Sequence, residues 1–160
     1  MIPRARKASA VSQTMRRGSA QTARLDWDDA VSDAFFTQCL KQGVRSELAI
    51  DALRDTSDQH SAAALRAVIT DATRRAALGW LTIEACLEQF GELAALALER
   101  CVEEAAVETQ SQRGLGPSSE MRPRTSQIVL RSRDEAASRI VKRGRDRIAR
   151  FWEQNGFFAA

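Results

Sequence analysis

The clearest hydrophobic pattern in the chain lies between Ile83 and Glu108. Apolar side chains recur there at steps of three and four residues, and the stripe consists of Ile83, Leu87, Phe90, Ala94, Ala97, Cys101 and Ala105, widened by Leu93, Leu98 and Val102. This period is that of an amphipathic α-helix, and Thr82 is placed to cap its first turn. Because so wide a stripe must be covered by neighbouring helices, the segment predicts a helical bundle.

Weaker patterns predict three more helices ahead of this one. The expected ranges are Asp26 to Gln42, Arg45 to Arg54 and Gln59 to Leu78. In the first of them, apolar side chains recur every four residues, at Val31, Phe35 and Cys39. Glycine commonly follows the last residue of a helix, so we expect Gly43 and Gly79 to end the first and third helices. The turn-forming residues 55–58, DTSD, supply a cap for the third helix.

The composition changes after residue 108. Residues 109–127 are rich in Gln, Ser, Gly and Arg and offer almost nothing to bury, which predicts a linker. A short β-like run follows at residues 128–130, and Ser132 and Glu135 then have the spacing of a capping box. We therefore expect a last helix from Ser132 to about Gln154, weakened in its middle by Gly144. The fold class predicted is all-α: an irregular antiparallel helical bundle, followed by a linker and a basic C-terminal helix.

Charge divides the chain into three zones. Residues 1–25 carry six Lys or Arg and no acid, residues 26–121 have a net charge of −9, and residues 122–160 have a net charge of +6. The first zone lacks a sustained apolar period, which predicts a disordered basic tail, although its composition also suits an organelle transit peptide. The expected divisions are a tail at 1–25, a bundle at 26–108, a linker at 109–131, and a basic helix and tail at 132–160.

The cellular setting is constrained by what the sequence lacks. No stretch approaches the roughly 20 apolar residues that a membrane span needs. Three cysteines, Cys39, Cys86 and Cys101, are odd in number and form no C-x-x-C pair. This pattern indicates reduced, half-buried thiols in a cytoplasmic protein with no membrane partner.

Candidate catalytic and metal-binding groups are sparse. His60 is the only histidine, and we expect it to be an exposed residue at a helix start. The glutamates between residues 84 and 103 lack the Glu-x-x-His companion of carboxylate metal sites in bundles, so we expect them to face solvent. The glycines at 114 and 116 lack the strand, helix and lysine of a phosphate-binding loop. We therefore predict no catalytic, cofactor-binding or metal-binding site formed by this chain alone.

The basic run from Arg131 to Arg150 is a candidate binding surface. The side chains expected to contact an anionic partner are Arg139, Lys142, Arg143, Arg147 and Arg150. Clustered arginines neutralise phosphates and release counterions, and Phe151 or Trp152 could stack on bases. Acidic residues interrupt the run, so the partner could be either a nucleic acid or an acidic protein.

Two stretches of the chain resemble one family of enzymes. Residues 31–42, VSDAFFTQCLKQ, and residues 74–102, RRAALGWLTIEACLEQFGELAALALERCV, are similar to the helical region ahead of the first catalytic centre of the bacterial bifunctional glutamine synthetase adenylyltransferase/deadenylylase. Residues 125–130, TSQIVL, stand where the first catalytic strand of that family begins. The resemblance covers residues 27–130. It implies a nucleotidyltransferase family that moves AMP from ATP to a tyrosine of glutamine synthetase, and removes it by phosphorolysis, in nitrogen regulation.

The catalytic motifs of that family do not follow in this chain. In the family, the strand leads into a Gly-Lys-Leu-Gly-Gly turn and a Gly-Ser-Asp-x-Asp motif, whose aspartates hold Mg²⁺. Here Leu130 is followed by RSRDEAASRIVKRGRD, so no catalytic residue carries over, and ATP and Mg²⁺ are implied only for the complete family. We expect a truncated or partial relative, inactive alone, that acts as a scaffold or docking surface for glutamine synthetase.

The alternative is a genuine small helical binding module that uses its basic C-terminal helix on nucleic acid or an acidic protein. The two hypotheses differ in what the gene contains. A truncated or frame-disrupted relative should carry both missing motifs in another reading frame just past Leu130, and a genuine small module should not.

Overall fold

The computed structural model describes residues 27–114 and 124–156, and within them every element is a helix joined by short turns. The elements are the π-helix η1 (Ala34–Leu40) and the α-helices α2 (Lys41–Arg54), α3 (Gln59–Phe90), α4 (Glu92–Gly114) and α5 (Arg124–Gln154). Residues 27–33 form a further α-helical stretch that leads directly into η1. The predicted all-α class is confirmed.

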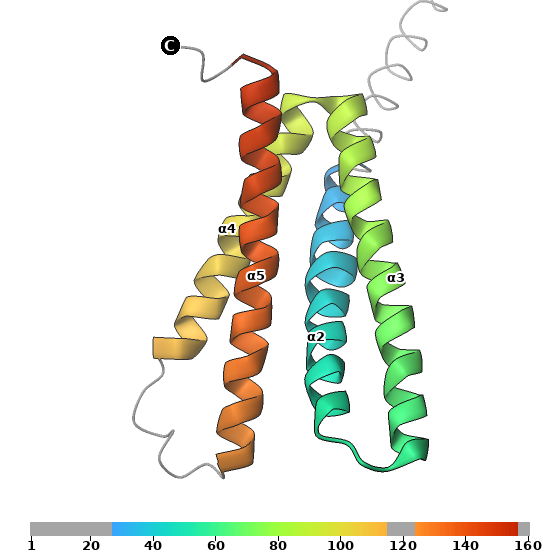
Figure 1. The fold of residues 1–160 in the computed structure, drawn as a ribbon. Coiled ribbons are helices and arrows are strands. Elements are labelled where there is room, and N and C mark those ends of the chain that lie inside the picture. The colour runs from blue at the N-terminus through green and yellow to red at the C-terminus, as the bar shows by residue number, and fades with distance from the viewer. Residues whose placement is uncertain (1–26, 115–123, 157–160) are drawn as a thin grey trace, which may run out of the picture.

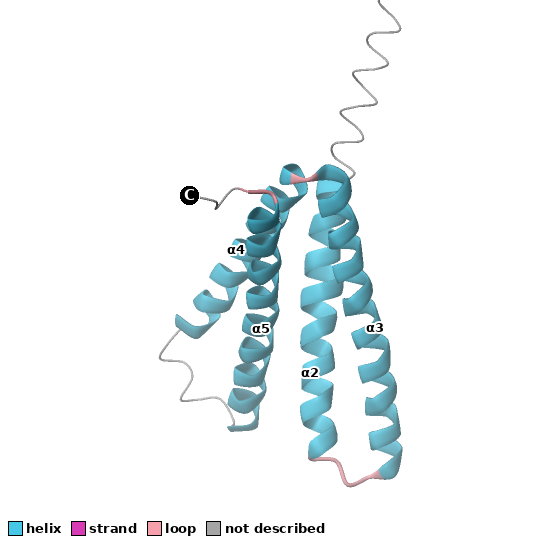
Figure 2. Ribbon diagram, turned by 45° about the horizontal axis from the view of Figure 1, so that its top comes forward, coloured by secondary structure: helices cyan, strands magenta, loops and turns pink. Residues whose placement is uncertain are grey.

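Four helical rods run up and down beside one another (Figures 1 and 2). Residues 27–54, including η1 and α2, form one continuous rod, which we call the first helix. This first helix packs on α3, and α4 packs mainly on α5. In addition, α5 contacts α2, so the basic C-terminal helix belongs to the bundle and does not follow it as a separate element.

The glycines predicted to end helices do not end them. Gly43 lies inside α2 and Gly79 lies inside α3, which continues to Phe90. The chain breaks instead at Gly91, whose φ of +55° suits glycine and whose N–H donates to the carbonyl of Leu87 at 3.0 Å. Thr82 is therefore no cap. Its hydroxyl donates to the carbonyl of Leu78 at 3.0 Å, inside the helix.

The start of the last helix was also wrong in the sequence-based prediction. Helix α5 begins at Arg124, so Ser132 lies inside it and forms no capping box. Residues 125–130 are helical and not a strand, and residues 109–114 still belong to α4. A strand would need a partner for its backbone groups, and the described part of the chain contains none, whereas a helix bonds internally. Residues 115–123 of the expected linker and the tail at 1–25 lie outside the described residues.

The π-helix explains how the first helix keeps its apolar stripe in the core. Val31, Phe35 and Cys39 are all 0% exposed, as their spacing predicted. In an α-helix a step of four residues advances by about 40°, so a longer stripe at this spacing would drift off the core. The wider turns of η1 absorb part of that drift. The sequence pattern predicted the stripe but not the π-helix.

One hydrophobic core joins all four rods. Its largest fully buried side chains are Phe35, Ile83, Leu98, Val31, Val102 and Cys39. Helix α5 adds Ile140, Val141 and Ile148 to the same cluster. The C-terminal helix therefore buries its apolar face as the other helices do.

The three cysteines lie in or beside this core as free, buried thiols. Burial raises the pKa of Cys39 to about 12, although the charges of Arg147 and Arg143 partly oppose this. Burial also raises the pKa values of Cys86 and Cys101. All three thiols therefore stay protonated at neutral pH, which suits packing and not nucleophilic chemistry.

Two helical glycines mark points where rods approach closely. A Cβ at Gly79 would lie 2.7 Å from Cβ of Gln38 and 2.9 Å from the backbone oxygen of Ala34. A Cβ at Gly144 would lie 2.6 Å from a methyl group of Val102. Glycine at these positions lets α3 approach η1 and lets α5 approach α4, so both residues serve packing.

Replacing Gly79 by alanine should destabilise the fold. The new methyl group would meet backbone and Cβ atoms that cannot rotate away, and overpacking of this kind costs about 1–3 kcal/mol. Gly43→Ala is the matched control, because its Cβ would meet the terminal carbon of Ile140, 2.6 Å away, which can change rotamer. The gain in helix propensity, up to about 1 kcal/mol, should offset much of that cost. Urea unfolding followed by circular dichroism measures both, and equal losses for the two variants would contradict this packing.

Candidate binding site on the charged face of α5

The arginines of α5 reach acidic side chains on each of the other three rods. Arg139 binds Glu47 of α2, and this hydrogen bond raises the pKa of the guanidinium. On α3, Glu84 Oε1 accepts from Nε and Nη2 of Arg147 at 3.2 and 3.0 Å. On α4, Glu103 Oε1 accepts from Nε and Nη2 of Arg145 at 3.2 and 3.0 Å. The basic zone and the acidic zone of the sequence thus meet within one molecule.

The contact of Arg147 is the best shielded of these ion pairs. Only 12% of its side chain is exposed, against 51% for Arg145. Its guanidinium also lies over the ring of buried Trp80, 4.3 Å from the ring centroid. An exposed pair such as Arg145 with Glu103 contributes at most about 1 kcal/mol. A guanidinium held between a carboxylate and a desolvated indole contributes more to the free energy of folding. Among these arginines, Arg147 therefore contributes most to holding α5 on the other rods.

The basic residues predicted to contact an anion all have partners within the chain. Besides Arg139 and Arg147, Lys142 pairs with Asp146 at 3.3 Å on the same helix. Arg150 donates to the backbone oxygen of Asp146 at 3.2 Å. Arg143 lies beside the Trp80 ring, 5.5 Å from its centroid. An anionic partner would therefore compete with contacts that the fold already makes.

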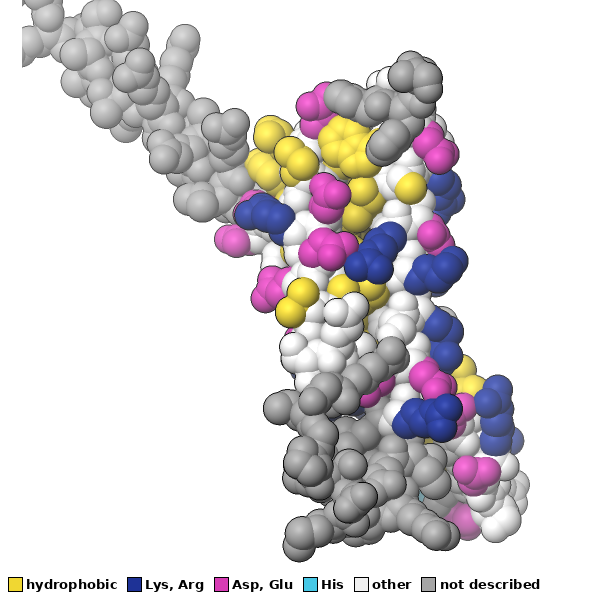
Figure 3. Space-filling view, turned by 90° about the vertical axis from the view of Figure 1, so that its left-hand side faces the viewer, with side chains coloured by type: hydrophobic (Ala, Val, Ile, Leu, Met, Phe, Trp, Pro, Cys, Tyr) yellow, Lys and Arg dark blue, Asp and Glu magenta, His cyan; other side chains and the backbone are white. Residues whose placement is uncertain are grey.

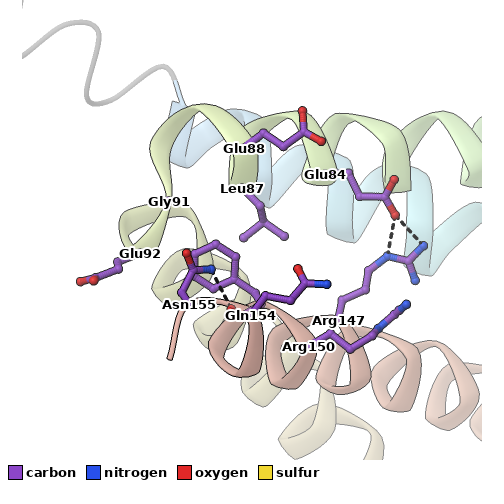
Figure 4. Close-up of a pocket in the computed structure, with 10 residues that line it drawn as sticks. Glu84, Leu87, Glu88, Gly91, Glu92, Arg147, Arg150, Gln154 and Asn155 are labelled. Carbon is purple, nitrogen blue, oxygen red and sulfur yellow. Dashed lines mark hydrogen bonds and ion pairs between the residues drawn. The ribbon is translucent and has the colours of Figure 1, made fainter. Parts of the chain in front are cut away.

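A hollow of about 540 Å³ lies where the ends of α3 and α5 meet (Figure 4). Figure 4 shows Arg147 bound to Glu84 at one side, with Arg150 nearby and Glu88 on the facing helix. The remaining lining residues are Leu87, Gly91, Glu92, Phe151, Gln154 and Asn155. Because both signs of charge and apolar groups line it, this hollow presents no uniform surface to a simple anion.

A second concavity, which the sequence analysis missed, runs between the first helix, α4 and α5. Its volume is about 620 Å³, and one wall consists of Phe36, Leu40, Val44 and Leu48. Ala105 of α4 and Ala137 of α5 complete its apolar lining, and charged or polar side chains stand around it, namely Lys41, Arg45, Glu108, Thr109, Arg133 and Asp134. We call this concavity the apolar groove.

A sequence signal for the groove did exist. The four wall residues follow one another at steps of four, on both sides of Gly43. Such a stripe continues only if the helix passes through the glycine, as it does in the structure. Treating Gly43 as a helix end divided the stripe in two and hid it.

Two polar residues, Asp58 and His60, lie at the start of α3. His60 is exposed near the start of α3, as expected. Asp58 caps that helix, because its carboxylate accepts from the N–H of Ser61 at 2.7 Å. Hydrogen bonds from the Ser61 side chain and from its N–H lower the pKa of Asp58. Across residues 27–114 and 124–156, no three His, Cys, Asp or Glu side chains gather in a way that could hold a metal ion. In the same ranges, none of the helices combines the length and apolar character needed to cross a membrane.

Removing the Arg147 side chain should weaken the fold more than removing its exposed neighbour. Arg147→Ala loses the bond to Glu84 and the cover over Trp80, and we expect a loss of about 1–3 kcal/mol in the free energy of unfolding. Arg145→Ala should cost less than about 1 kcal/mol. Urea unfolding measures the difference, and tryptophan fluorescence of the folded variants should change only for Arg147→Ala. Indistinguishable variants would show that the Trp80 contact contributes nothing.

The chain was compared with protein-family models, curated proteins and solved structures. No protein-family model matches the chain. No curated protein and no solved structure matches it either.

Proposed function

We propose that this chain is a helical binding module that takes an amphipathic helix of a protein partner into the apolar groove. The observation that carries the proposal is the wall of the groove. Phe36, Leu40, Val44 and Leu48 are only half-buried, although the first three pack against the core. An amphipathic helix offers apolar side chains at three- and four-residue steps, which fit a groove of this kind.

The surroundings of the groove favour a partner of mixed charge. Lys41 and Arg45 stand one turn apart on α2, while Glu108 lies opposite on α4. A bound helix with acidic side chains towards α2 and a basic side chain towards α4 would match both edges. Such an arrangement fixes the direction in which the partner helix lies.

The arginines of α5 are already paired within the chain, which favours a protein partner over a nucleic acid. Tight binding to nucleic acid depends on unpaired Lys and Arg side chains that neutralise phosphates and displace the counterions condensed on them. The contacts of Arg139 with Glu47 and of Arg147 with Glu84 would have to be given up first. We therefore expect only weak binding to duplex DNA or RNA in a gel shift. A tight complex that weakens steeply with salt would favour the nucleic-acid alternative.

The resemblance to glutamine synthetase adenylyltransferase suggests glutamine synthetase as one specific partner. The chain would then act as a docking surface and not as the transferase, because the sequence contains neither the Gly-Lys-Leu-Gly-Gly nor the Gly-Ser-Asp-x-Asp motif. Purified chain mixed with Mg²⁺, ATP and glutamine synthetase should transfer no AMP. Transfer above background would refute the docking role.

Site-specific photo-crosslinking tests the groove directly. A p-benzoylphenylalanine at position 48 lies in the groove, and the same residue at position 81 is the matched control on the outer face of α3, where Leu81 is 61% exposed. In cells that make the chain, position 48 should yield a defined adduct, and position 81 should not. An additional Val44→Glu substitution should reduce that adduct at least tenfold, because a charge enters the apolar wall.

Two outcomes would contradict the proposal. Equal adducts from positions 48 and 81 would mean that the groove has no preference over an ordinary exposed leucine. The absence of any adduct from position 48 would mean that no partner enters it. An adduct that contains glutamine synthetase would support the partner that the resemblance suggests.

A further inference from the structure

We propose that residues 1–25 of this chain bind back onto the outer face of α4, with their basic side chains on its glutamates. This contact lies on a different face from the apolar groove and does not depend on the proposed function. It would place the basic zone at residues 1–25 on a face of α4 where, among the glutamates, α5 binds only Glu103.

The outer face of α4 is apolar and acidic at once. Leu93, Leu96 and Val107 are 43%, 50% and 61% exposed. Exposed glutamates stand around them at positions 92, 99, 103 and 104, of which Glu103 also binds Arg145 of α5. Glu108 stands at the edge of the apolar groove, and Arg100 is the only base between residues 92 and 108. This stretch therefore has a net charge of −4. Figure 3 shows this side of the molecule, with hydrophobic and acidic side chains together near its upper end.

The described chain begins beside this face. Trp27 lines a hollow of about 650 Å³ together with Leu93, Leu96, Glu99, Arg100 and Glu103. The Trp27 ring stacks on Phe90, with centroids 5.8 Å apart, and Asp28 accepts from Arg100 at 2.7 Å. These contacts fix the start of the first helix against the end of α3 and against α4. The described chain therefore begins, at Trp27, in the wall of the hollow.

The composition of residues 1–25 complements that face. The segment carries six Lys or Arg and no acid, and it also offers apolar side chains such as Val11, Met15 and Leu25. The face from Leu93 to Val107 is about 21 Å long, which a segment of this length spans easily. Because the segment is tethered at the hollow, its effective concentration there is on the order of millimolar, so individually weak contacts suffice.

A second copy of the chain fits this face less well. Two α4 helices brought face to face would set a net charge of −4 against another of −4. Like charges at close range oppose association. A basic segment of the same chain meets the opposite charge and needs no second molecule.

Zero-length carbodiimide crosslinking of the full-length chain tests this contact. The chain has only three lysines, Lys7, Lys41 and Lys142, so adducts of Lys7 are readily assigned by mass spectrometry. At low salt, Lys7 should join glutamates of α4, chiefly positions 99, 103 and 104, within monomers. High salt should reduce the yield at least fivefold, because the contact is electrostatic and exposed.

Substitutions separate this contact from random collisions. Arg16→Gln with Arg17→Gln should lower the yield of Lys7 adducts with α4 at least threefold. Arg74→Gln with Arg75→Gln, a matched exposed pair on α3, should leave it unchanged. The proposal is overturned if Lys7 joins distant carboxylates such as Asp51 and Asp71 as often as those of α4. It is equally overturned if Lys7 adducts with α4 occur only between two chains, or do not form.

Discussion

The fold depends on the match between α5 and the surface on which it lies. Three arginines of this helix each bind one glutamate, on a different one of the other three rods. The apolar face of α5 packs into the common core. Arg147 makes the best shielded of these links, because it lies between Glu84 and the ring of Trp80. Surface ion pairs alone contribute little, so the apolar face supplies most of the stability, while the charges select the orientation of the helix.

Because α5 packs within the bundle, the basic zone of the sequence has a structural role. In the sequence, the basic segment after residue 121 suggested either an interaction helix or the end of a truncated or frame-disrupted relative. In the structure, Ile140, Val141 and Ile148 are buried, and Gly144 allows close contact with Val102. Three arginines of α5 are bound by glutamates of the other rods, which is why we propose the apolar groove, and not this face, as the binding surface.

Local patterns predicted helical segments, but not where the helices begin and end. The helix predicted from Ile83 to Glu108 is divided at Gly91 between α3 and α4, and the two predicted before residue 55 are one. The stripe of Val31, Phe35 and Cys39 was readable because its period lies within one segment. The roles of Gly79 and Gly144 were not, because each is defined by a partner on another rod, Ala34 in one case and Val102 in the other. Glycine ends helices often enough to suggest a stop, and only the packing partner shows otherwise.

The same distinction applies to the candidate site. The sequence identified Arg139 and Arg147 as basic residues, but their partners Glu47 and Glu84 lie 92 and 63 positions away. The apolar groove was not predicted for a related reason. Its wall continues past Gly43, which the sequence suggested as the end of a helix. Chemistry that belongs to single residues could be predicted, and chemistry that arises where two rods meet could not.

Amide hydrogen exchange of the native chain tests most directly whether α5 is an integral part of the bundle. If it is, amides of α5 around Ile140 to Ile148 should open with the same free energy as amides of α3 around Trp80 to Cys86, because both require global unfolding. Exchange of α5 at rates near those of an unfolded peptide, while α3 remains protected, would contradict this account.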